Sequence, residues 1–286
     1  MSIASEIERL NNAKAAIKAS IENKGVEVAD DAKLDSYPAL IESIEAGGGS
    51  STDDFYNLLT KNGTNYYRLF YGKDIKSLDL SNWNTSQVTN MVEMFYNCYT
   101  LTTLNLSNFD TSNVTDMNYM FRQCGDLISL DVSSFDTSNV TNMWAMFYQC
   151  NKLTTLDVSN FNTSNVTNMN NMFYNCYTLT TLNLSNFDTS NVTDMDSMFN
   201  NCYALTSLDL SNFNTSNVTT MSRMFSNCNV LHTLRLDNCS NDTINKIITS
   251  SNFPTTAIEG KTRTIYCKES EAAGLTAPTN WVFSYV

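Results

Sequence analysis

The chain repeats itself every 26 residues, and no other feature constrains its fold as strongly. One copy reads LTTLNLSNFDTSNVTDMNYMFRQCGD, and the copies follow one another almost without insertions. The equivalent leucines are Leu78, Leu104, Leu130, Leu156, Leu182, Leu208 and Leu234. A single unit of this length cannot bury its own apolar residues, whereas stacked units share a continuous core. The sequence therefore predicts a solenoid.

Within a unit the apolar period changes from that of a strand to that of a helix. Leu104 and Leu106 alternate with polar residues, which predicts a short strand. The next apolar residues fall at intervals of three, three, one and three, which forms one stripe on a helix: Val114, Met117, Met120, Phe121 and Cys124. Asn113 would cap that helix, and Asp116 would lie in its first turn. We therefore expect an α/β solenoid of the leucine-rich-repeat class, each unit a strand, a turn and a short helix.

The repeats occupy residues 78–238, and seven stacked strands are expected there. One asparagine register just after the strand is expected to be buried and to bond backbone groups of neighbouring coils; Ser134 replaces the amide in one unit, and the asparagines are Asn82, Asn108, Asn160, Asn186, Asn212 and Asn238. Residues 54–77 resemble a half-repeat that would cap the first coil. Residues 239–286 would form an α/β cap with a helix at about 242–250, followed by strand, helix and strand.

Residues 1–46 form a different module. Their apolar residues alternate steps of four and three, apart from Lys14, which predicts a helix that packs on a partner helix through Ile3, Ile7, Leu10, Ile17 and Ile21. A second short helix completes a helical hairpin. Residues 47–53, rich in glycine and serine, read as a flexible linker. The module is therefore expected to mediate docking or self-assembly, with a trimer favoured.

The charge excludes two classes of partner. A net charge of −12 would repel nucleic acid and anionic membrane surfaces. No stretch reaches the roughly 20 apolar residues that span a bilayer. The start, MSIASEIERL, shows no secretory signal, so we expect a cytosolic protein or one that leaves the cell by lysis as part of a particle.

The fixed letters L..L.LSNFDTSNVT.M..MF..C resemble the 26-residue repeat of bacterial surface proteins, in the BspA-like branch of the leucine-rich-repeat proteins. The resemblance covers about residues 75–238 and implies a right-handed solenoid used for adhesion, without enzymatic activity. Residues 2–45 are similar to a helical module at the head of tail-fibre and other virion proteins of gut bacteriophages. Surface members of the repeat family carry export signals and anchors, and their absence here favours a phage product.

The positions that vary between repeats are the candidate binding residues. Three neighbouring registers on the predicted helix accept residues as different as Arg, Asn, Ser and Tyr, so we expect them to face water. Tyrosine and tryptophan on such a face supply contact area at low entropic cost, although unconstrained drift would produce the same variation. The candidates are Tyr96, Tyr119, Arg122, Trp144, Tyr148, Tyr174, Tyr177 and Arg223.

Other ladders are read as structural. Six cysteines in register and two methionine ladders lie on the core stripe, so buried thiols and thioethers are expected there, and no metal site. Cys239 and Cys267 are off register and could pair. The outward Asp/Asn ladder of the strands could line a glycan or calcium groove, but a solvated sheet face is favoured. The recurring Asn-Val-Thr is read as helix capping.

No catalytic constellation accompanies the single histidine, His232, so an enzyme and a cofactor are not expected. The first hypothesis is a bacteriophage tail-fibre or receptor-binding protein that contacts a host cell-surface protein or glycan, and other virion tail proteins through residues 1–46. The alternatives are a bacterial cell-surface adhesin and an intracellular interaction scaffold. The ligand, and the face that binds it, are left open by the sequence.

Overall fold

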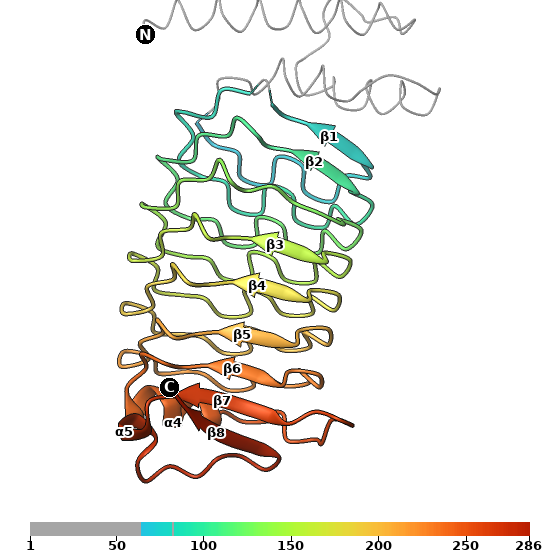
Figure 1. Ribbon diagram of the computed structural model, residues 1–286. Coiled ribbons are helices and arrows are strands. Elements are labelled where there is room, and N and C mark those ends of the chain that lie inside the picture. The colour runs from blue at the N-terminus through green and yellow to red at the C-terminus, as the bar shows by residue number, and fades with distance from the viewer. Residues whose placement is uncertain (1–63, 82) are drawn as a thin grey trace, which may run out of the picture. The chain divides into compact units, whose positions relative to one another are not determined.

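A computed structural model describes residues 64–81 and 83–286, which belong to the compact unit Thr64–Val286. In this unit the chain winds into stacked coils, with the strands in one column along one side (Figure 1). The expected helical hairpin at 1–46, its apolar positions and the linker at 47–53 lie outside the described residues, as do residues 54–63 of the expected N-terminal cap.

The strand column follows the 26-residue period. Its repeat members are three residues long, and each buries a central leucine between two outward side chains: β1 (Ser77–Asp79), β2 (Thr103–Asn105), β3 (Thr155–Asp157), β4 (Thr181–Asn183), β5 (Ser207–Asp209) and β6 (Thr233–Arg235). Paired strands are parallel and in register, with Leu78 opposite Leu104 and Leu208 opposite Leu234. The solenoid expected from the repeat is confirmed.

One coil departs from the expected seven strands. The segment around Leu130 has no assigned strand, although Leu130 is buried like its counterparts. Ile128 stands there where other repeats carry threonine, and its side chain is 55% exposed. In two other repeats the threonine hydroxyl bonds the preceding coil: Thr102 Oγ1 donates to the carbonyl of Lys76 at 2.8 Å, and Thr180 Oγ1 donates to that of Thr154 at 3.2 Å. Isoleucine cannot make that bond. The strand ladder is interrupted at this coil and again between β4 and β5.

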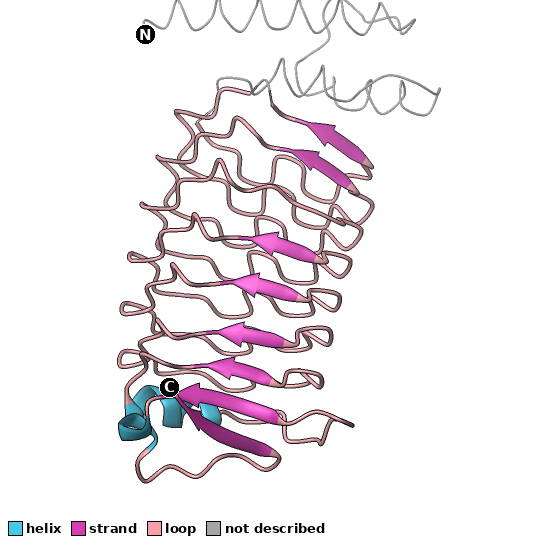
Figure 2. Cartoon of the chain, viewed as in Figure 1, coloured by secondary structure: helices cyan, strands magenta, loops and turns pink. Residues whose placement is uncertain are grey.

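The expectation of a short helix in every repeat is wrong. Over residues 64–81 and 83–286 the only α-helices follow the repeats, and the rest of each coil is turns and loops (Figure 2). The amides of Met120, Arg122 and Cys124 donate to carbonyls three residues back. The intervening amides of Tyr119, Phe121 and Gln123 donate to the next coil instead, at 2.9, 3.0 and 2.7 Å. The segment is thus a run of tight turns cross-linked between coils.

Two residues in each run adopt left-handed backbone. Tyr119 has φ of 57° and Gln123 has φ of 62°, and the pattern recurs along the stack. Positive φ at the third residue of a turn belongs to type II geometry and cannot continue a right-handed helix. Consecutive turns, each closed by a hydrogen bond from an amide to the carbonyl three residues earlier, bury the same apolar stripe as a helix would. The spacing therefore predicted the buried residues correctly and the backbone incorrectly.

The core is a column of stacked rings. Seven phenylalanines lie over one another with centroid separations of 5.3 to 5.7 Å and interplanar angles of 4° to 10°: Phe70, Phe95, Phe121, Phe147, Phe173, Phe199 and Phe225. Met117, Phe121 and Cys124 have no exposed surface. Each unit thus completes its interior only with its neighbours.

The cysteine ladder is structural, as expected. All eight cysteines are free and buried, including Cys239 and Cys267. In the repeats each thiol donates to a phenylalanine carbonyl of the preceding coil, as Cys124 Sγ does to Phe95 O at 3.2 Å. Burial raises the pKa of the Cys176 and Cys228 thiols to about 12. These thiols remain protonated hydrogen-bond donors at neutral pH.

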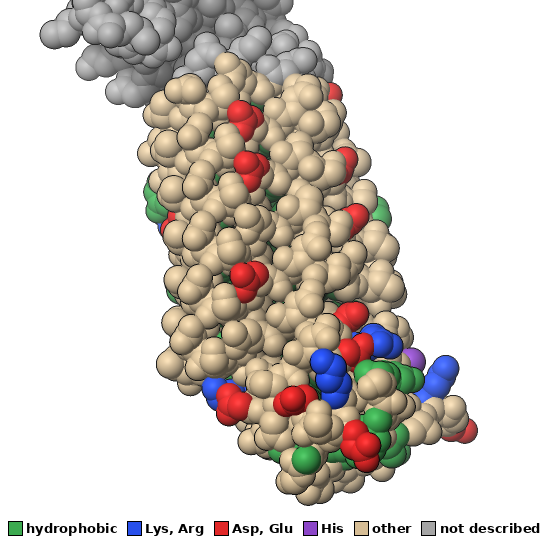
Figure 3. All heavy atoms as spheres, turned by 60° about the vertical axis from the view of Figure 1, so that its left-hand side comes forward, with side chains coloured by type: hydrophobic (Ala, Val, Ile, Leu, Met, Phe, Trp, Pro, Cys, Tyr) green, Lys and Arg blue, Asp and Glu red, His purple; other side chains and the backbone are tan. Residues whose placement is uncertain are grey.

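Two asparagine registers tie coils together. Asn113 does not cap a helix: its amide donates to Ser86 O at 2.8 Å, and the Asn-Val-Thr asparagines that follow repeat this contact, as Asn139 does with Ser112 O at 2.7 Å. Asn108 likewise donates to Ser81 O at 2.7 Å, but it is exposed, contrary to the expectation of burial. Asparagine can bridge coils at the rim because only its donor must reach the neighbouring carbonyl. This side of the stack is largely uncharged, apart from acidic side chains in file along the repeats (Figure 3).

After the repeats the chain closes the core. Here lie α4 (Asn241–Ile248), β7 (Arg263–Cys267), α5 (Glu269–Ala272) and β8 (Trp281–Tyr285), and β7 and β8 extend the parallel sheet beyond β6. Phe253 contacts Phe225 edge-on and Trp281 at 5.2 Å between centroids, which ends the ring column. The elements match the helix, strand, helix and strand expected at these positions.

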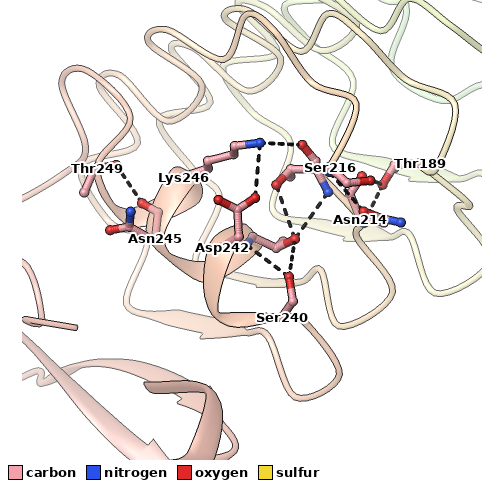
Figure 4. A network of polar contacts seen from close by, with 10 residues as sticks. Thr189, Asn214, Ser216, Ser240, Asp242, Asn245, Lys246 and Thr249 are labelled. Carbon is pink, nitrogen blue, oxygen red and sulfur yellow. Dashed lines mark hydrogen bonds and ion pairs between the residues drawn. The ribbon is translucent and has the colours of Figure 1, made fainter. Parts of the chain in front are cut away.

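Helix α4 is held to the last coils by polar contacts (Figure 4). Lys246 Nζ donates to Thr215 O at 2.9 Å and pairs with Asp242 at 3.2 Å. Ser240 caps the helix by accepting from the amide of Thr243, whose hydroxyl also meets Thr215. These bonds satisfy groups of the last coil that have no further repeat to bond.

Candidate recognition surface

The runs of turns form one longitudinal surface of the stack, here called the turn face: residues 91–98 and their equivalents in later repeats. Left-handed residues recur on it, and its side chains project between coils that are joined by backbone hydrogen bonds. Side chains 23 to 27 residues apart in sequence are thereby brought into contact. Variable residues on this face can combine into one site.

Arg122 lies at the centre of the largest cluster on the turn face. Its guanidinium carbon is 5.0 Å from the ring centroid of Tyr96, 4.7 Å from that of Tyr119 and 4.6 Å from that of Tyr148. The three rings come from three consecutive repeats. Such distances are those of cation–π contacts.

Further rings extend this cluster in both directions. Tyr119 contacts Trp144 at 4.6 Å, and Tyr148 stacks on Tyr174 at 4.7 Å with an interplanar angle of 4°. On the N-terminal side Tyr71 meets Tyr96 edge-on at 5.0 Å. We call the set the tyrosine–arginine cluster: Tyr71, Tyr96, Tyr119, Arg122, Trp144, Tyr148 and Tyr174. Trp144 is 38% exposed, and Tyr71 is exposed too, so the rings are accessible while their neighbours hold them in place.

Six of the eight candidate residues from the sequence meet in this cluster. Tyr177 lies beside it and stacks on Tyr203 at 5.2 Å. Arg223 lies in the last repeat, apart from the cluster, where it pairs with Asp196 at 3.4 Å. The sequence interpretation missed Tyr203, which stands 26 residues after Tyr177, and Tyr71, which precedes Tyr96 by 25. Tyr203 could have been found from the 26-residue register. Tyr71 could not, because its spacing from Tyr96 is one residue shorter than the repeat.

Not every variable position faces water. Glu93, Ala145 and Ser197 share a register with Tyr119 and are exposed by only 9%, 1% and 3%. Left-handed backbone at this register keeps the side chain close to the stack, where adjacent coils cover the smaller residues. This register of the turn face accepts several residue types although its side chains are partly covered. The expectation that all variable positions are exposed is wrong.

Partial burial also affects the pKa values of two tyrosines in the cluster. Desolvation raises the pKa of Tyr119, and the nearby charge of Arg122 opposes that rise. Desolvation likewise raises the pKa of Tyr148. Both phenols are therefore neutral hydrogen-bond donors near pH 7.

The sheet face offers a shallow groove of about 570 Å³ along β3 to β6. Asp157 and Asp209 lie on it, and their Oδ1 atoms accept from the amides of Ser159 and Ser211 at 2.9 Å. A hydrogen bond from the Ser159 side chain is the main cause of the lowered pKa of Asp157. These carboxylates stabilise turns within their own coil, which supports a solvated sheet face.

Within the residues that the structure describes, no group of three His, Cys, Asp or Glu side chains could hold a metal ion. His232 lies at the rim of the sheet, with Nδ1 3.0 Å from the hydroxyl of Thr233. Over the same residues no helix has the length and apolar character to cross a bilayer.

The in-register coils and their shared core define a repeat solenoid. A family described as "Mycoplasma protein of unknown function, DUF285" matches residues 64–176 and 152–257, which together make up more than half of the chain. The chain belongs to this family, and its repeat is of the BspA-like leucine-rich-repeat type.

No protein of curated function matches the sequence. Among solved structures, a leucine-rich-repeat protein from Bacteroides ovatus is similar, with 14% identity over 74% of this chain and 70% of that chain. The TM-score of 0.19 is too low to carry an argument about fold or function.

Proposed function

We propose that the protein is a non-enzymatic recognition protein that binds a cell-surface ligand through the tyrosine–arginine cluster. The observation that supports this is the convergence of three tyrosine rings from successive repeats on one guanidinium, with three further aromatic rings packed against those tyrosines. Aromatic side chains with few rotatable bonds, already held by neighbours, lose little entropy when a ligand binds.

The fold itself does not require these aromatic residues. In the C-terminal repeats the positions of Tyr119, Trp144 and Tyr148 are taken by Ser197, Ser222 and Ser226. Those coils keep the same turns, with φ of 57° at Ser197 and inter-coil bonds as in the other repeats. Folding therefore does not account for the aromatic residues at these positions, which favours a role in binding.

A triple variant tests this proposal. Tyr119→Ser, Trp144→Ser and Tyr148→Ser together copy residues that the chain already uses at these positions, so the array should stay folded. We expect binding to intact target cells to fall at least tenfold, because three anchors of the surface are removed. Flow cytometry with labelled protein measures binding, and circular dichroism with thermal unfolding checks the fold.

The matched control alters the sheet groove. Thr155→Arg, Thr181→Arg and Ser207→Arg place bulky side chains on exposed positions of that groove without touching the core. We expect this variant to bind as the parent does. If the groove variant loses binding and the serine variant keeps it, the ligand site is on the sheet face and the proposal is wrong.

The finer part of our proposal places the protein in a bacteriophage virion, as a tail-fibre or receptor-binding component that acts in several copies. It is motivated by the resemblance of residues 2–45 to virion attachment modules, together with a repeat type suited to adhesion. A bacterial cell-surface adhesin is the alternative that the repeat family favours. In both settings several linked copies would increase the apparent affinity for a cell surface.

Deletion of residues 1–46 tests the assembly role. We expect the full chain to form a small oligomer, with a trimer favoured, and the shortened chain to be a monomer by light scattering. A monomeric full chain at micromolar concentration would exclude self-assembly. Immunogold electron microscopy of particles and cells then separates the two settings, since label on cell envelopes alone contradicts the virion proposal.

A further inference from the structure

Three arginines lie on or beside the turn face, and only one lacks a carboxylate. Arg68 Nε contacts Glu93 at 2.7 Å, and Arg223 pairs with Asp196 at 3.4 Å. Arg122 forms no ion pair with any residue in 64–81 or 83–286. The tyrosines around it contribute ring faces, which stabilise a cation without neutralising it.

The guanidinium of Arg122 is also incompletely bonded. Its Nε is buried and makes no hydrogen bond. A buried donor without a partner is unfavourable, and such a group in a native structure calls for an explanation. The surrounding rings leave Arg122 half-buried, so part of its side chain is exposed on the turn face, where a ligand can approach.

We propose that the tyrosine–arginine cluster binds an acidic sugar, with Arg122 contacting the anionic group of that sugar. A guanidinium matches the planar geometry of carboxylate and phosphate, and charge-assisted bonds to these groups are the strongest hydrogen bonds available to it. The inference rests on the proposed recognition function and names its ligand class.

The aromatic rings favour a sugar that bears an anionic group over a free inorganic anion as the ligand. Tyr96, Tyr119 and Tyr148 surround the cation with flat apolar surface, and exposed Trp144 continues that surface beyond it. Rings of this kind bury the apolar face of a ligand, while phenol hydroxyls donate to its polar groups. A pyranose that bears one anionic group presents both features within one unit.

The overall negative charge does not prevent such binding. At physiological salt, charges further apart than about 8 Å are largely screened. The carboxylate of Glu93, which shares a register with Tyr119, is engaged by Arg68 at 2.7 Å and does not neutralise Arg122. Locally the cluster therefore has an excess of positive charge in a chain that is acidic as a whole.

The test compares matched sugars on the full chain. Trigalacturonic acid, its neutral methyl ester and a trisaccharide phosphomonoester are titrated against the protein with NMR detection. We expect both acidic sugars to bind at least tenfold more tightly than the ester, and the stronger of the two identifies the anionic group as carboxylate or phosphate. Equal binding of ester and acids would overturn the proposal.

Variants assign the effect to Arg122. Arg122→Gln should remove the preference for acidic sugars, and it should fold normally because the same register carries Asn200 and Ser226. Arg223→Gln is the control, an arginine of the same face outside the cluster, and should leave the preference unchanged. A preference that survives in Arg122→Gln contradicts the assignment, as does equal binding of tri-glutamate and trigalacturonic acid.

The two proposals fail separately. Loss of cell binding in the triple serine variant, with no acidic-sugar preference in the parent, leaves recognition by the cluster standing and rejects the acidic sugar. Unchanged cell binding in both the triple serine variant and Arg122→Gln rejects both proposals.

Discussion

At the scale of the residue, the left-handed positions distinguish this solenoid from one with helical repeats. Gln149 has φ of 58°, and its amide donates to Tyr174 O of the next coil at 2.8 Å. An L-residue in this region carries a cost that glycine avoids, and β-branched residues suffer most. The coils retain non-glycine residues there because the inter-coil hydrogen bonds hold the turn.

Substitution of Gln149 checks this backbone. We expect Gln149→Val to be less stable than Gln149→Gly by about 1–3 kcal/mol, because valine is strained at positive φ. Urea unfolding measures the difference. In a helix the order would be reversed, since glycine is the poorer helix former.

Gln87 provides the matched control, because it is an exposed glutamine outside the set of residues with positive φ. There valine should be no worse than glycine. If valine were tolerated at Gln149 as well as glycine, the left-handed turn would be contradicted.

At the scale of the element, the repeats show what a strand of three residues needs. A strand this short has few backbone bonds, so the hydroxyls of flanking threonines such as Thr102 and Thr180 add useful contacts between coils. Thr102, Thr154 and Thr180 occupy the position before the strand, and the Thr180 hydroxyl bonds Thr154 O at 3.2 Å. The coil with Ile128 lacks this bond and has no assigned strand.

We therefore expect Ile128→Thr to stabilise the array. The new hydroxyl should bond the carbonyl of Thr102 and raise the free energy of unfolding by about 0.5–1.5 kcal/mol, the usual net value of one hydrogen bond. The converse change, Thr180→Ile, should lower it by a similar amount. Denaturant unfolding measures both, and a neutral or destabilising Ile128→Thr would show that the hydroxyl does not hold the ladder.

At the scale of the whole molecule, a solenoid separates its tasks by face. The interior repeats Phe, Met and Cys with little change because each coil must fit two neighbours. The rim repeats asparagine and threonine because each donor must reach the coil before it. The turn face differs from repeat to repeat: the N-terminal repeats gather aromatic residues there, while the C-terminal repeats carry serine and asparagine.

The sequence by itself determined the period, the stacked architecture, the buried stripe and the candidate surface residues. Each depends on a residue type recurring at a fixed step, and equal steps in sequence become equal positions in a stack. It also predicted the free structural thiols, since copies displaced by one repeat point the same way.

Only the tertiary structure decided the backbone of the turn face and the arrangement of its side chains. A helix and a run of consecutive turns would bury the same residues. They differ in the acceptors of alternate backbone amides, and in this protein those acceptors are carbonyls of the next coil. The convergence of Tyr96, Tyr119 and Tyr148 on Arg122 depends on those same inter-coil bonds. Because they join residues about 25 positions apart, no local pattern in the sequence contains them.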